Sequence, residues 1–336
     1  MSITAQHTAP VTAAERNHIA MLLIQQYPCL SGSFGSGHNK KNVEAAGLVY
    51  EKKKAGRKRK ILESSEIIPP IPEGESEHTM NEQHAQLMAF CKSNKQDVML
   101  VRQLMDGTFP KRRKTIIEEN ERVWKILKDY PPFAKGKGIE IKAELGRILQ
   151  RERVSQEMKE AFEMIRPRLL ATLKRNSKKE IQSLFLELDE CDATQITELE
   201  NRCLIAALPF VLGEKKNAST SVGDLFWKIV DTEEGETNMM KEIEKSSTPR
   251  LVSSGTALNV EALCLAAEGM VVCKFGPTNA ILNAVVTLLA SYYDFNASYP
   301  SGLYKNVYIF LEHVLLSKPP SSMPIAVDNF LSEINQ

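Results

Sequence analysis

Apolar residues recur at steps of three and four through most of residues 80–232. This spacing places apolar side chains on one face of an α-helix, whereas a half-buried strand would alternate them. Prolines and polar stretches interrupt the pattern and divide it into several helices. Because 43% of the residues are hydrophobic, these helices can bury a common core. The pattern therefore predicts a multi-helical body.

The pattern changes after residue 248. Two short β-compatible runs flank Glu268-Gly269, and this arrangement predicts a hairpin. Two apolar helices are expected next, within residues 277–300 and 302–317. The uncharged run from Phe275 to Tyr293 approaches membrane-spanning length, but it opens with Gly-Pro and contains several Asn, Thr and Ser residues. We therefore expect a buried core helix there, and the nearby tyrosines are expected in the core.

The expected fold class is mainly α, with a multi-helical body, a small β-hairpin in a C-terminal α+β unit, and a disordered basic N-terminal arm. Little of the region after Pro28 can bury apolar surface. The expected division is an N-terminal helix (1–28), a disordered basic and Pro-rich linker (29–78), a helical domain (79–232), an acidic and polar linker (233–247) and the α+β unit (248–336). Within the helical domain, Val222 to Val230 is expected to be a helix.

The six cysteines are scattered, without a C-x-x-C pair and without a histidine at metal-ligand spacing. This usage indicates buried thiols in a reducing compartment rather than a disulfide framework or a metal site. We expect no metal and no cofactor. The sequence contains no G-x-S-x-G, no H-E-x-x-H and no kinase motif set, so we expect no enzyme, with dispersed catalytic residues as the open alternative.

Positive charge is concentrated in one stretch. Residues 40–60 hold nine cations and two acids, a net charge of +7 in a chain whose net charge is +1. The block matches the form of a nuclear localisation signal, which works when it is extended and exposed. Direct contact with nucleic acid is the second interpretation and a solvated tail the third. The residues concerned are Lys52, Lys53, Lys54, Arg57, Lys58, Arg59 and Lys60.

A second basic cluster consists of Lys111, Arg112, Arg113 and Lys114. It falls in the first turn of a predicted helix, where cations oppose the helix macrodipole. Such a local conflict, together with the free N–H groups of a helix start, is compatible with binding of an anion or an acidic partner. The alternative is that Glu118 and Glu119 neutralise the cations at helical spacing.

Four blocks of the chain carry a family resemblance. They are "IIPPIPEGE", "RQLMDGTFPKRRKTIIEE", "LENRCLIAALPFVLGE" and "AILNAVVTLLASYYDFNASYPSGLYKNVYIFLEHVLL". In this order they resemble an animal protein family often labelled sterile alpha motif domain-containing protein 3-like, over most of residues 65–330. The sterile alpha motif domain itself has no counterpart here. The resemblance implies a helical protein without an assigned enzymatic activity and a Lys/Arg-rich segment before the "PPIPEGE" block.

These observations predict a non-enzymatic nuclear protein that acts in protein interaction or as a scaffold. Its expected partners are an unidentified protein and a nuclear import receptor bound by the basic arm, and no membrane is expected. The alternative function is nucleic-acid binding through the basic arm and residues 111–114, and the alternative location is the cytoplasm.

Overall fold

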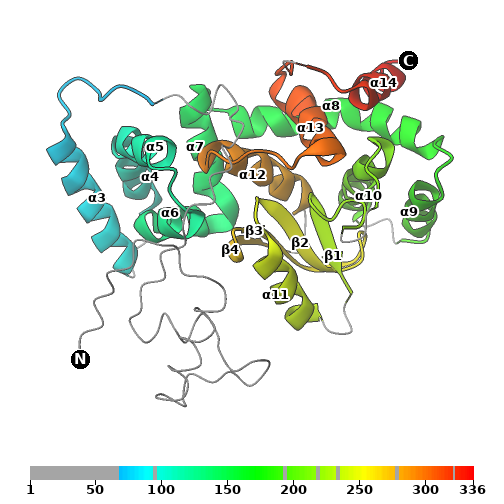
Figure 1. Cartoon of the computed structure of the whole chain (residues 1–336), viewed down its shortest axis with the longest axis horizontal. Coiled ribbons are helices and arrows are strands. Elements are labelled where there is room, and N and C mark those ends of the chain that lie inside the picture. Colours follow the sequence, from blue (N-terminus) through cyan, green and yellow to red (C-terminus); the bar gives the residue numbers. More distant parts are fainter. Residues whose placement is uncertain are drawn as a thin grey trace, which may run out of the picture. The chain divides into compact units, whose positions relative to one another are not determined.

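The computed structural model describes residues 68–93, 97–191, 195–216, 220–231, 235–276, 280–320 and 322–336. All of them belong to one compact unit, residues 59–336 (Figure 1). The predicted N-terminal helix, the basic stretch and most of the predicted linker 29–78 lie outside the described residues.

The described part is mainly α, as predicted, and twelve α-helices make up most of it. They are α3 (Glu77–Lys92), α4 (Val98–Gly107), α5 (Phe109–Glu118), α6 (Val123–Asp129), α7 (Ile139–Leu149), α8 (Val154–Lys174), α9 (Lys179–Asp189), α10 (Ile196–Val211), α11 (Gly235–Lys245), α12 (Ile281–Asp294), α13 (Lys305–Leu316) and α14 (Ile325–Ile334). Three short 3-10 segments, η2 (Pro131–Ala134), η3 (Gly136–Gly138) and η6 (Gly302–Tyr304), connect some of them.

Local capping explains where the first helices begin. At the start of α3, the Ser76 side chain accepts from the Thr79 N–H at 3.2 Å, and the Thr79 hydroxyl accepts from the Ser76 N–H at 2.8 Å. This reciprocal pair is a capping box, which satisfies two N–H groups that a helix start leaves without partners. Asp97 caps α4 through the Leu100 N–H at 3.0 Å.

Four strands form one sheet in the order β1-β2-β3-β4: β1 (Trp227–Val230), β2 (Arg250–Gly255), β3 (Val260–Ala267) and β4 (Met270–Phe275). Strands β1 and β2 are parallel, and the other two pairs are antiparallel. The predicted hairpin is β3-β4. Its turn residues Glu268 and Gly269 have φ values of 48° and 82°, the two positive values that a type I′ turn requires.

Two sequence predictions near the sheet are wrong. Residues 222–230 are turns followed by β1 rather than a helix, because β-branched Ile229 and Val230 extend along β2. The stretch expected to be a linker contains α11, which connects the parallel strands β1 and β2 as a crossover helix. Helix α11 buries Ile243 against Val230 and Val252 on one face of the sheet. The boundaries of the five expected parts remain a prediction.

Helix α12 lies at the centre of the main core. It packs against α7, α8 and α10 and against strands β2 and β3, on the opposite side of the sheet from α11 (Figure 1). One hydrophobic cluster extends from Leu87 in α3 to Ile334 in α14, so helices and sheet share it. The uncharged run near the C-terminus is therefore a core helix, as predicted. No helix in the described ranges is both long and apolar enough to cross a membrane.

Most tyrosines near the C-terminus belong to this core, as predicted, whereas Tyr304 is half-buried outside it. The rings of Tyr292, Tyr299 and Tyr308 contact one another with centroids 4.7 to 4.9 Å apart. The hydroxyl of Tyr292 donates to the carbonyl of Pro249 at 2.6 Å, and that of Tyr308 donates to the carbonyl of Leu225 at 2.7 Å. The three rings thus fill the core, and the hydroxyls of Tyr292 and Tyr308 bind the backbone.

Candidate functional site

The predicted basic cluster lies on α5, and its four side chains have different environments. Arg112 and Arg113 are fully buried. Lys111 donates to the Asn81 side chain at 2.6 Å, and Lys114 lies 3.7 Å from a carboxylate oxygen of Glu77. The prediction of a four-cation contact site is therefore wrong for Arg112 and Arg113, because internal partners hold their charges. Only Lys111 and Lys114 remain for such a contact.

Arg112 binds Glu144 of α7 through two parallel hydrogen bonds, from Nε to Oε1 at 2.8 Å and from Nη2 to Oε2 at 2.6 Å. This bidentate geometry is the strongest form of such a pair. Its Nη1 donates to the Thr108 hydroxyl at 3.0 Å, and its guanidinium lies 4.8 Å from the centre of the Tyr130 ring. Burial favours the neutral form of Glu144, but the adjacent Arg112 holds the Glu144 pKa below its usual value.

Arg147 extends this arrangement on α7. Its Nη1 donates to Glu144 Oε2 at 3.0 Å, its Nε donates to Asp106 at 2.6 Å, and its Nη2 lies 3.4 Å from Glu140 Oε2. Glu144 thus accepts from two guanidinium groups, as a buried carboxylate must if it is to remain ionised.

Arg113 connects α5 to the C-terminal end of α12. Its Nη1 donates to the carbonyl oxygens of Tyr293 at 3.2 Å and Asp294 at 3.0 Å. A cation at this end complements the helix macrodipole. The Asp294 carboxyl is fully buried, and its oxygens have no hydrogen-bond partner among the described residues. Burial, reinforced by the nearby Glu144, raises the pKa of Asp294 well above its usual value, so this environment favours the protonated carboxyl.

We call this set the buried charge network; its members are Arg112, Arg113, Glu140, Glu144, Arg147 and Asp294, with the exposed Asp106 at its edge. Three guanidinium groups lie among four carboxyl groups, and the raised pKa of Asp294 disfavours its charged form. The network joins α4, α5, α7 and α12, and hydrogen bonds among its members hold the Glu144 carboxylate. Its ion pairs hold these helices together, so its role is structural. One sequence signal points to it: Arg112 and Arg113 lie four and three residues before the buried Ile116, on the same helical face.

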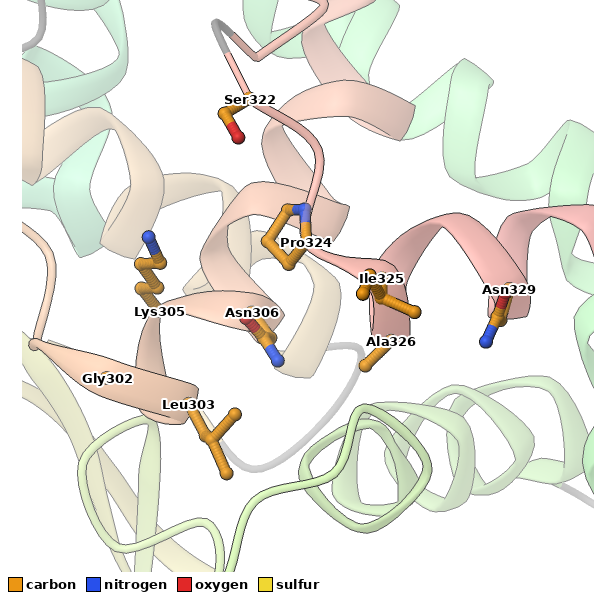
Figure 2. A pocket seen from close by; sticks show the side chains of 9 residues that line it. All are labelled: Gly302, Leu303, Lys305, Asn306, Ser322, Pro324, Ile325, Ala326 and Asn329. Atoms are coloured by element: carbon orange, nitrogen blue, oxygen red, sulfur yellow. The ribbon is translucent and has the colours of Figure 1, made fainter.

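A second feature is an open groove with a volume of about 680 Å³ between the start of α13 and the start of α14. Figure 2 shows Leu303 and Asn306 on one wall and Ile325 and Ala326 on the other. Its lining is mostly apolar, and Leu303 and Ile325 keep 45% and 79% of their surface exposed. The complete lining is Gly302, Leu303, Lys305, Asn306, Ser322, Pro324, Ile325, Ala326 and Asn329.

The loop after α10, residues 212–216, supports this groove from below. Asn306 Nδ2 donates to the carbonyl of Leu212 at 3.0 Å, and the Tyr304 hydroxyl lies 3.3 Å from the carbonyl oxygen of Lys215. The groove therefore joins three segments that are distant in sequence. None of them carries a motif, which explains why the sequence did not indicate the groove.

A buried carboxyl lies in the same loop. Glu214 Oε2 accepts from the Gly223 N–H at 3.0 Å, and Oε1 has no hydrogen-bond partner among the described residues. Burial is the main cause that raises the Glu214 pKa to about 7, and nearby Asp224 contributes in the same direction. Glu214 is thus one of the groups whose charge changes near neutral pH.

The described cysteines are buried or half-buried thiols without disulfides. Burial raises the pKa of Cys203, Cys264 and Cys273 to about 12, so these thiols are not thiolates at neutral pH. Within the described ranges, no group of three or more His, Cys, Asp or Glu side chains has the arrangement of a metal site.

Residues 80–135, from the first turn of α3 to the end of η2, match the family model described as "Sterile alpha motif domain-containing protein 3, helical domain". This match supports a sterile alpha motif domain-containing protein 3-like family assignment. The resemblance inferred from the sequence blocks is thereby confirmed over residues 80–135. No curated protein and no solved structure among those compared matches the chain.

The matched segment contains α5 and therefore Arg112 and Arg113 of the buried charge network. The groove lies outside the matched segment. The seven cations from Lys52 to Lys60 lie outside the described residues, so their predicted roles stay predictions.

Proposed function

We propose that this protein is a non-enzymatic interaction or scaffold protein whose folded unit presents the groove between α13 and α14 to a protein partner. The observation that carries the proposal is the exposure of Leu303 and Ile325 on facing sides of an open, mostly apolar groove (Figure 2). Apolar side chains grouped in a concave surface are typical of a partner-binding site. The family assignment is consistent with this role.

The basic stretch supplies the second part of the proposal. Seven cations between Lys52 and Lys60 match a nuclear localisation signal, so the protein acts in the nucleus after binding an import receptor. Substitution of Lys58, Arg59 and Lys60 by Ala in a fluorescently tagged full-length chain should leave the protein in the cytoplasm. Nuclear accumulation of that variant would overturn the localisation.

Nucleic-acid binding remains the alternative function. The net charge of +7 over residues 40–60 favours it, whereas burial of Arg112 and Arg113 removes half of the second cluster from any such contact. Binding to duplex DNA should then weaken steeply with salt, with a slope of about −0.9 for each phosphate contacted. Lack of salt-dependent binding to DNA or RNA at low ionic strength would exclude this alternative.

The interaction role can be tested by proximity labelling with the full-length chain and with Ile325→Asp. An acid in the first turn of α14 suits the helix dipole, so this change disrupts the groove surface without weakening the helix. The matched control is Met164→Asp on α8, because the Met164 side chain is 78% exposed. We expect Ile325→Asp to lose a set of labelled proteins that Met164→Asp retains. Identical labelling by both variants would contradict the use of the groove.

A further inference from the structure

An exposed proline-rich segment precedes α3. Residues 68–75 read Ile-Pro-Pro-Ile-Pro-Glu-Gly-Glu, and Ile68 and Ile71 keep 38% and 46% of their surface exposed. Prolines favour the polyproline II conformation, which has three residues per turn. In that conformation Ile68 and Ile71 lie on one face, about 9 Å apart. The segment thus offers two aligned apolar side chains with acids after them.

The C-terminal end of this segment is anchored to α3. The Glu75 N–H donates to the carbonyl of Pro72 at 3.0 Å, and the Glu75 carboxylate accepts from the Thr79 hydroxyl at 2.6 Å and from Gln83 Nε2 at 3.2 Å. Helix α3 packs against α4 and η2. The segment is therefore held beside α3, and its two isoleucines remain partly exposed.

The groove has the complementary character. Leu303, Pro324 and Ile325 supply an apolar surface, and Lys305 is the one charged residue of the lining. Two more exposed lysines, Lys215 and Lys216, belong to the loop that contacts Tyr304. An apolar groove with cations beside it matches an apolar segment followed by acids, and a proline-rich segment loses little entropy when it binds.

We infer that residues 68–75 of one copy dock in the groove of a second copy of this chain. Ile68 and Ile71 contact Leu303 and Ile325, and Glu73 faces the lysines. This inference rests on the proposed function, since it names the partner of the same groove. Each copy has one segment and one groove, so the contact is head-to-tail and adds further copies unless a ring closes. Such a short segment buries little surface area, so each contact is weak and reversible.

The decisive experiment mixes two defective full-length variants. Ile68→Ser with Ile71→Ser removes the apolar face of the segment, and Ile325→Asp disrupts the groove. Sedimentation of the wild type should show mass that rises with concentration, beyond a dimer. Each variant alone should associate at least about tenfold more weakly, a loss of about 1.4 kcal/mol, because it lacks one of the two apolar surfaces of the contact. The mixture should form a one-to-one dimer and nothing larger, because only one intact segment and one intact groove can meet.

Several outcomes would overturn the inference: a wild type that stays monomeric, variants that associate like the wild type, or a mixture that remains monomeric. A synthetic peptide of residues 68–77 should also dissociate wild-type assemblies, while the same peptide with both isoleucines changed to serine should not. If the wild type is monomeric but Ile325→Asp still changes the labelled proteins, self-association is wrong and the interaction role stands. If the labelling is also unchanged, both proposals fail.

Discussion

Arg112 illustrates how a residue that appears to be a surface cation can hold a core together. Its guanidinium is enclosed by Glu144, by the hydroxyl of Thr108 and by the Tyr130 ring. Burial of an ion pair gives little net stability over an apolar core, but removal of one partner leaves the other charge buried without compensation. The stability of this region therefore depends on keeping both members of each pair.

Arg112→Ala should lower the free energy of unfolding by about 3–5 kcal/mol, because Glu144 loses its bidentate partner in a dry environment. The measurement is urea denaturation followed by circular dichroism. Lys114→Ala, two residues further along α5 and exposed, is the control and should change stability by less than about 0.5 kcal/mol. Similar losses for the two variants would show that the Arg112–Glu144 pair does not stabilise the core.

Glu214 predicts a dependence of stability on pH. Its pKa is raised to about 7 in the folded protein, so folding favours the protonated form. The stabilising contribution of this proton is complete below the ordinary glutamate pKa of about 4.5 and is lost as the pH rises through about 7. Glu214→Gln mimics the protonated form and should be more stable than the wild type by about 1–3 kcal/mol at pH 8.

Unfolding free energies of wild type and Glu214→Gln, measured between pH 5 and pH 8, test this prediction. The advantage of the glutamine variant should grow with pH through this range. An advantage that is constant, or that grows toward acid pH, would show that folding does not raise the pKa of Glu214.

At the scale of elements, close contact between η3 and α12 requires a residue without a side chain. Gly138 has a φ of 74°, and a Cβ there would lie 2.4 Å from Thr287 Cγ2. Gly138→Ala should therefore destabilise the protein by about 2–4 kcal/mol, through left-handed backbone strain and overpacking together. Gly74→Ala provides the matched control: its φ is 85°, but its Cβ would have no atom within 4 Å.

The control should lose only about 1–2 kcal/mol, the cost of the left-handed conformation alone. Thermal unfolding of the two variants separates the cost of backbone strain from the cost of overpacking. The difference between their melting temperatures reports the close contact between η3 and α12. Equal melting temperatures would mean that the Thr287 side chain moves aside without cost.

The elements also show what the sequence could predict. Periodic apolar residues identified most helices between residues 80 and 211, and the turn chemistry of Glu268-Gly269 identified the hairpin. Strand β1 was mistaken for a helix because four residues are too short to show a period, and α11 was missed because its acidic start resembles a linker. Strand β1 forms because it pairs with β2, which is distant in sequence, and α11 connects these two strands. A local sequence pattern carries no information about that pairing.

At the scale of the whole molecule, the sequence predicted the fold class but not the candidate sites. The groove is formed by residues 302–306, by residues 322–329 and by the loop 212–216, and their proximity depends on how the core packs. The burial of the arginines in the buried charge network was not predicted, for a related reason. Arg112 and Arg113 look exposed in a basic run, and only Glu144 and the end of α12 explain their burial. The small net charge of +1 does not reveal which cations are buried.

The contact between Arg113 and the end of α12 also limits how early the protein can complete its fold during synthesis. Its two acceptors, the carbonyl oxygens of Tyr293 and Asp294, follow Arg113 by 180 and 181 residues. A ribosome that has finished the predicted helical domain at residue 232 has not yet made them. Helix α5 of the growing chain must therefore keep the Arg113 charge in water, and its final burial waits until residue 294 has been synthesised.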